Sequence, residues 1–172
     1  MRNKAVVVLA GVMGIASAGL TFLSWARLYD VGLYWNAFGV YTGPNDNYNN
    51  RFGPPLGHLV NTVPGWTVLT ASVAATITVA AATRMRRLGL VAPVFAFVAF
   101  VAAVACLAHP AFLISDLKAA LSPADPDRAF LNSGVVITEV VTTGVLVMCT
   151  SLAAISGIRR GRAERRSPVT TD

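Results

Sequence analysis

Four long, almost unbroken apolar stretches dominate the pattern of hydrophobic and polar positions along this chain. They cover residues 5–25, 65–83, 88–108 and 133–157. An apolar run of about 18 residues or more is long enough to cross a bilayer as a helix. A soluble helix would instead alternate apolar and polar faces. The pattern therefore predicts an all-α membrane protein built as a bundle of four transmembrane helices.

The composition agrees with this class of protein. Hydrophobic residues make up 55% of the chain and charged residues only 13%, whereas a soluble domain carries about 25% charged residues. The four spans leave no room for a separate soluble domain in 172 residues. We therefore expect one transmembrane domain over residues 1–158 and a basic cytoplasmic tail over residues 159–172.

Basic residues gather on one side of the predicted membrane. They precede the first span, separate the second from the third, and follow the fourth: Arg2, Lys4, Arg84, Arg86, Arg87, Arg159, Arg160, Arg162, Arg165 and Arg166. Positively charged loops stay in the cytoplasm. Both termini are therefore predicted to be cytoplasmic, in a multi-pass protein of the plasma (inner) membrane.

The tail charge suggests a lipid partner. Basic residues next to a span attract anionic headgroups, so Arg159, Arg160 and Arg162 are predicted to contact lipid headgroups. The alternative is that they only determine topology. No nucleic-acid-binding motif accompanies the charge, and nucleic acid is not expected as a partner.

The start of the chain allows a second interpretation. The small residues Ala16-Ser17-Ala18 after a short apolar stretch are typical of a signal-peptide cleavage site. The apolar run nevertheless continues through Trp25 and reaches spanning length, which favours an uncleaved helix.

The first external segment, residues 26–64, is rich in aromatic residues. Within residues 31–42, large apolar side chains alternate with others, which predicts a small β element. Three roles remain open for the aromatics: an interfacial belt, a folded cap over the helices, or a docking surface for a partner. The predicted docking residues are Leu33, Trp35, Phe38 and Tyr41.

The second external segment, residues 109–132, predicts a short amphipathic helix lying at the membrane surface. Its apolar face is expected to consist of Phe112, Ile114, Leu117 and Leu121.

Glu139 is the one charged residue inside the fourth apolar run. An ionisable group at membrane depth costs a few kcal/mol or more, so Glu139 is predicted to face the bundle interior. Helical spacing adds Thr142 and Thr143 to a predicted intramembrane polar site. The favoured role is a structural anchor, satisfied by Arg27, Arg128, the threonines or water. A proton or cation site and a contact to a partner subunit remain open.

Other reactive residues match no established motif. His58, His109, Asp116 and Glu139 could form a cluster in principle, but their spacing fits no metal-ligand pattern. Cys106 and Cys149 form no redox pair. The chain carries no phosphate-binding loop, nucleophile elbow or zinc-protease motif. We therefore expect no cofactor and no metal, and a non-enzymatic role is favoured.

The first external loop also carries a family resemblance. Gly32-Leu33-Tyr34-Trp35, followed by Thr42-Gly43, resembles the Gly-Leu-Trp region of the claudin-like four-span superfamily. The resemblance implies a small β-sheet over a four-helix bundle. The paired loop cysteines of that family are absent. Separately, alanine- and valine-rich spans and twelve arginines against two lysines are similar to small actinobacterial four-span proteins, some of which are accessory subunits of envelope machines such as Mce lipid transporters.

These observations predict a non-catalytic accessory or scaffold subunit of a larger plasma-membrane complex, such as a lipid transporter. Its expected partners are membrane lipids and other integral membrane subunits. The rival hypothesis is a small proton- or cation-coupled transporter, or a membrane-embedded enzyme, centred on Glu139.

Overall fold

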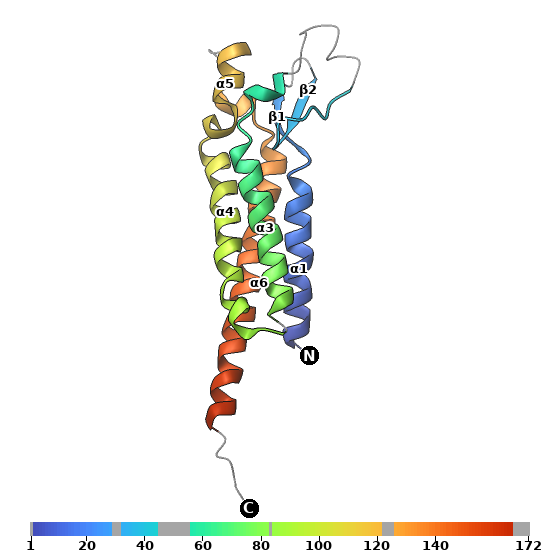
Figure 1. Cartoon of the computed structure of the whole chain (residues 1–172). Coiled ribbons are helices and arrows are strands. Elements are labelled where there is room, and N and C mark those ends of the chain that lie inside the picture. The colour runs from blue at the N-terminus through green and yellow to red at the C-terminus, as the bar shows by residue number, and fades with distance from the viewer. Residues whose placement is uncertain (1, 29–31, 45–55, 83, 122–125, 167–172) are drawn as a thin grey trace, which may run out of the picture.

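Four long helices run side by side along most of the molecule (Figure 1). The computed structural model describes residues 2–28, 32–44, 56–82, 84–121 and 126–166. The long helices are α1 (Arg2–Leu20), α3 (Val63–Ala81), α4 (Ala92–Ala108) and α6 (Ser133–Arg166). Contacts join α1 to α3, α3 to α4, α4 to α6 and α6 to α1. The helices therefore close into a four-membered bundle.

Among the described residues, three segments are long and apolar enough to cross a membrane: Val63–Ala81, Leu88–Ala120 and Ser133–Gly157. The first helix contributes a shorter apolar segment, Lys4–Leu20. These lengths agree with the predicted helical membrane protein. The fourth crossing and the orientation remain predictions.

The first helix ends earlier than the sequence pattern predicted. The apolar run was expected to stay helical through Trp25, but Ser24–Leu28 forms strand β1. Trp25 is fully buried, and its indole Nε1 donates a hydrogen bond to the Leu20 carbonyl over 3.0 Å. That carbonyl belongs to the last helical turn, where intrahelical donors run out. A long apolar run can therefore end in a buried strand, because hydropathy does not distinguish protein interior from lipid.

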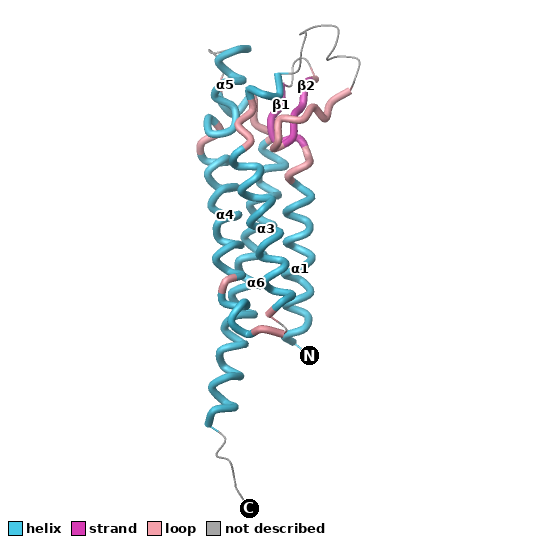
Figure 2. The backbone as a smooth tube through the Cα atoms, viewed as in Figure 1, coloured by secondary structure: helices cyan, strands magenta, loops and turns pink. Residues whose placement is uncertain are grey.

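The predicted β element is confirmed for part of its range. Strand β2 (Leu33–Asn36) pairs antiparallel with β1, and the two strands lie at one end of the bundle (Figure 2). Leu33, Trp35 and Ala37 are fully buried, as their alternation predicted. Asn36 is buried as well, and its Oδ1 accepts hydrogen bonds from the backbone N–H groups of Phe38 and Val40, both over 2.9 Å.

A tight turn follows β2 and packs against the short 3₁₀ helix η2 (Leu56–Leu59). Gly39 has φ of 71°, a left-handed conformation that side chains disfavour. A Cβ atom at Gly39 would also collide with the Gly57 carbonyl oxygen. Glycine is therefore required here by both conformation and space.

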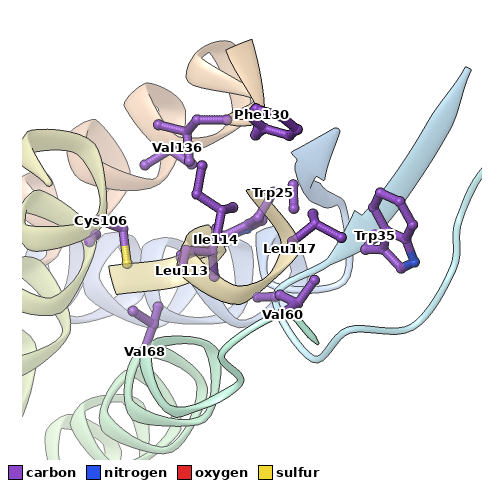
Figure 3. Close-up of a cluster of buried hydrophobic side chains, with 14 of the residues drawn as sticks. Trp25, Trp35, Val60, Val68, Cys106, Leu113, Ile114, Leu117, Phe130 and Val136 are labelled. Carbon is purple, nitrogen blue, oxygen red and sulfur yellow. The ribbon is translucent and has the colours of Figure 1, made fainter. Parts of the chain in front are cut away.

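The hairpin, helix α5 (Ala111–Leu121) and the start of α6 share one apolar cluster, which we call the cap core (Figure 3). Backbone hydrogen bonds hold its parts together: Arg27 N–H donates to the Phe130 carbonyl, and Asn132 N–H to the Trp25 carbonyl, each over 2.8 Å. The largest fully buried side chains of the cap core are Trp25, Trp35, Phe130, Leu33, Leu113, Ile114, Leu117 and Leu131.

Helix α5 confirms the predicted helix in the second external segment but corrects its apolar face. Ile114 and Leu117 of the predicted apolar face are buried in the cap core, and Leu113 is buried beside them. Phe112 is 56% exposed, and the side chain of Leu121 lies outside the described residues. The contacts of α5 with the cap core therefore determine which of its residues are buried.

The opposite end of the bundle holds the start of α1 and the end of α6 (Figure 1). The short 3₁₀ helix η3 (Arg86–Leu90) joins α3 to α4 there, and these two helices are in contact as their short connection predicted. Helix α6 runs on to Arg166, so the start of the predicted tail at residue 159 is not marked by a break in the helix. Arginine, alanine and glutamate are good helix formers, which accounts for the extension.

Buried tryptophan should dominate the stability of the cap. Trp35→Ala is expected to lower the free energy of unfolding by about 3–5 kcal/mol, because a large buried side chain is lost. Trp66 is the same residue type at 54% exposure, and Trp66→Ala should cost much less. Thermal unfolding of both variants in detergent measures the difference. Equal losses would contradict the assignment of Trp35 to the cap core.

Candidate functional site

Glu139 lies inside the bundle, two helical turns from the cap end of α6. It follows Ser133 by six residues, which is about 9 Å along a helix axis at 1.5 Å per residue. Its side chain is fully buried. The residue faces the interior, as the cost of exposing a carboxyl to lipid predicted.

Two serines from other helices accompany the carboxyl group. The hydroxyl of Ser17 on α1 donates to Glu139 Oε1. The same Ser17 hydroxyl lies 2.7 Å from the hydroxyl of Ser72 on α3. Both serines are fully buried. We call these three residues the polar triad; it links α6, α1 and α3 through hydrogen bonds at one level of the bundle.

The second carboxyl oxygen of Glu139 differs from the first in its hydrogen bonding. Glu139 Oε2 is buried and has no hydrogen-bond partner within the part of the chain that the structure describes. A buried acceptor that is left unsatisfied costs about 1–3 kcal/mol, and more when it is charged. The carboxyl group is therefore only half satisfied by the polar triad.

Within the described residues, the carboxyl group of Glu139 has Ser17 as its partner, which the prediction did not name. Arg27 is not its hydrogen-bond partner, and the side chain of Arg128 lies outside the described residues. Thr143 is buried close by, and its hydroxyl donates to the Glu139 backbone carbonyl over 2.7 Å, not to the carboxyl. Thr142 is partly exposed and donates to the Thr138 carbonyl over 2.8 Å. Both threonines thus use their hydroxyls within α6 itself.

The predicted docking residues divide into two pairs. Leu33 and Trp35 are fully buried in the cap core, which fits the capping alternative. Phe38 and Tyr41 are half-buried. The Tyr41 ring meets Trp35 edge-on at 6.3 Å, and its hydroxyl donates to the Pro44 carbonyl over 2.8 Å. Surface for a partner therefore remains on Phe38 and Tyr41, and the docking role stays a prediction.

The end of the molecule that carries the two strands has an open cleft of about 630 Å³, which we call the cap cleft. His58 and Asp116 lie on its walls, with Phe38 and Asn61 among the other lining residues. His109 lies elsewhere, edge-on to Phe112 at 5.9 Å. Glu139 is closed inside the bundle, so the four residues of the hypothetical cluster do not come together.

The described residues form neither a cluster of metal ligands nor a pair of neighbouring thiols. Within the described ranges, no group of three or more histidine, cysteine, aspartate or glutamate side chains is arranged to hold a metal ion. Cys106 belongs to the cap core and Cys149 to a separate cluster further along the bundle. The two thiols are therefore buried in different places. The side chains of Arg159, Arg160 and Arg162 lie outside the described residues, and lipid contact there remains a prediction.

Ser17 and Ser72 are the members of the site that the sequence pattern did not single out. Ser17 sits within a small-residue seam of α1, next to Ala18 and one turn from Gly14. Ser72 begins a stripe of small and hydroxyl residues on α3 that includes Thr76. Small residues at both places are typical of close helix packing, but which hydroxyl meets Glu139 depends on the relative rotation of three helices.

No protein-family model, no curated protein and no solved structure matches this chain. The polar triad and the cap are therefore interpreted from their own chemistry and geometry.

The anchoring role of Glu139 is tested by replacing its carboxyl group. Glu139→Gln keeps an acceptor oxygen for Ser17 and should fold nearly normally. Glu139→Leu removes that acceptor, leaves the two serines without it, and is expected to cost about 1–3 kcal/mol of stability. Thermal unfolding in detergent measures both. A leucine variant as stable as the glutamine variant would rule out the anchor.

Proposed function

We propose that this chain is a non-catalytic accessory subunit of a larger plasma-membrane complex. The observation that carries the proposal is a row of accessible aromatic rings beside the cap cleft. Phe38 lines the cleft; its ring lies 5.2 Å from that of Phe22 and 4.8 Å from that of Trp66. Phe22 and Trp66 are 56% and 54% exposed. Aromatic side chains of this kind are enriched at protein interfaces and dominate their energetics.

The architecture supports a scaffold in two further ways. The cap core is filled by the chain's own tryptophans, so the exposed aromatic row is additional to what the cap itself needs. The polar triad cross-links three helices in the interior, which stiffens the body that carries the cap cleft. A rigid body with an accessible rim fits a subunit that positions partners.

The proposed topology has four spans, with both termini in the cytoplasm. Helix α1 packs in the bundle beside the three helices of spanning length, which supports a fourth crossing. The bundle end opposite the cap carries the exposed residues Lys4 and Arg84. Basic residues favour the cytoplasmic side, and the cap then faces outward.

The proposed partners are membrane lipids and other integral membrane subunits. A lipid transporter of the Mce type is the complex we favour, by analogy of composition and topology alone. The hairpin over the bundle supports an arrangement like that of the claudin-like proteins.

Loss of the aromatic row should weaken partner binding. Phe38→Ala is expected to reduce recovery of partner subunits about 5–30-fold, which corresponds to one or two kcal/mol at an interface residue. Co-purification in mild detergent with quantitative mass spectrometry measures the recovery. Phe97→Ala, at 56% exposure on α4, is the matched control and should leave recovery unchanged. Equal recovery from both variants, or a wild-type protein purified without any partner, would refute the docking role.

The topology is tested by cysteine labelling of intact cells. In a background with Cys106 and Cys149 replaced by alanine, Ser115→Cys on α5 should react with a membrane-impermeant thiol reagent, because the cap faces outward. Ala163→Cys near the end of α6 should react only after the cells are opened. Labelling of position 163 in intact cells would overturn the proposed orientation.

A further inference from the structure

Glu139 combines burial with an incomplete set of partners, and this combination bears on its charge. Its side chain is fully buried, and Oε1 has the Ser17 hydroxyl as its partner. Oε2 is buried and has no hydrogen-bond partner within the described ranges. A carboxylate spreads its negative charge over both oxygens and calls for several donors. The site supplies one.

The surroundings of Glu139 bring no compensating charge from the neighbouring helices. No charged residue occurs in residues 5–20 of α1, in Val63–Ala81 of α3 or in Ala92–Ala108 of α4. Glu139 is itself the one charged residue of Ser133–Gly157. The other titratable groups in these stretches are the thiols of Cys106 and Cys149, which ionise to anions and cannot neutralise a carboxylate.

At the cap end of α6, the structure describes the charged side chains of Arg27, Asp116, Lys118 and Asp127 but not that of Arg128. Strand β1 contacts α6 and carries Arg27, which has interactions of its own but does not hydrogen-bond the carboxyl. Lys118 on α5 forms an ion pair with Asp127 over 2.6 Å, and Asp116 lines the cap cleft. Within the described side chains, an ionised Glu139 would therefore be a buried charge without a paired cation, which is strongly disfavoured.

The polar triad can accommodate a neutral acid without moving any atom other than hydrogen. Between Ser17 and Ser72 either hydroxyl can be the donor. A proton on Oε1 reverses the hydrogen bond between Ser17 and Glu139 at the same atom positions, so that Glu139 donates to Ser17 and Ser17 donates to Ser72. The Ser72 hydroxyl can then donate back to a carbonyl of its own helix, as serines in helices do. Oε2 becomes a neutral carbonyl oxygen, for which an absent partner costs much less than for a charged one.

We propose that Glu139 is a proton-binding site of the closed bundle: the carboxyl group holds a proton taken from water and donates it as a hydrogen bond to Ser17. A bound metal cation is the less fitting ligand. Hard cations such as Ca²⁺ and Mg²⁺ take six or more oxygen ligands, whereas the polar triad offers one carboxyl group and two hydroxyls that already bond each other. This inference goes beyond the accessory role and does not depend on it.

Infrared spectroscopy of the full chain in lipid bilayers at neutral pH tests the proposal. The chain contains only two glutamates, Glu139 and Glu164. In a Glu164→Gln variant, glutamate labelled with ¹³C at the side-chain carboxyl therefore reports on Glu139 alone, without any change at the site. We expect the label to shift a carbonyl band of a protonated carboxylic acid and no carboxylate band.

Two other outcomes would overturn the assignment. A label shift confined to carboxylate bands means that Glu139 is ionised. If those bands also change when sodium replaces potassium in the buffer, a cation occupies the site in place of the proton.

Ser17→Ala in the Glu164→Gln background completes the test: the acid band should persist at a changed frequency, since its hydrogen-bond acceptor is lost. An unchanged frequency would exclude Ser17 as the acceptor and refute the proposed geometry.

Discussion

A carboxyl group buried among apolar helices must find its polar partners on those helices, and the rest of this fold is arranged around that requirement. The hydroxyls of Ser17 and Ser72 reach the level of Glu139 from α1 and α3. Successive helical residues are about 100° apart, so a shift of one residue would turn either serine away. The polar triad therefore constrains the rotation of three helices, which apolar contacts alone specify weakly.

Close packing makes these hydrogen bonds possible. Gly14, one turn from Ser17 on α1, lies against Thr76 and the Ser72 carbonyl on α3, and any side chain at this glycine would collide with Thr76. Small residues let helix backbones approach closely in membranes, where lipid offers no hydrophobic drive for association. The seam between α1 and α3 is thus narrow where the two serines meet.

The cap sets the position of α6 and hence the depth of Glu139. Where α1 ends, Trp25 satisfies the Leu20 carbonyl, and β1 binds the segment before α6 through Phe130 and Asn132. Helix α6 begins at Ser133, directly after this link. The hairpin is therefore both a cover over one end of the bundle and the spacer that aligns α6 with α1. The exposed aromatic rings of Phe22 and Trp66 and the fully buried polar triad therefore belong to different environments of one small protein.

The sequence alone determined two kinds of feature: those that depend on the length of an apolar run, and those that depend on the free-energy cost of placing one side chain in lipid or water. Long apolar runs predicted the helices, since spanning length is a property of consecutive residues. A single carboxyl in an apolar run predicted that Glu139 faces inward, and alternation predicted burial of Leu33 and Trp35. Tertiary structure decided where distant residues meet. Trp25 lies in a strand, Leu113 is buried in the cap core, and Glu139 has Ser17 as its partner. The hydropathy of a side chain is the same whether it faces lipid or a protein core, so one segment does not show which of the two surrounds it. The rotation of a helix is set only when helices pack against each other, so one segment does not show which residues of other helices it meets.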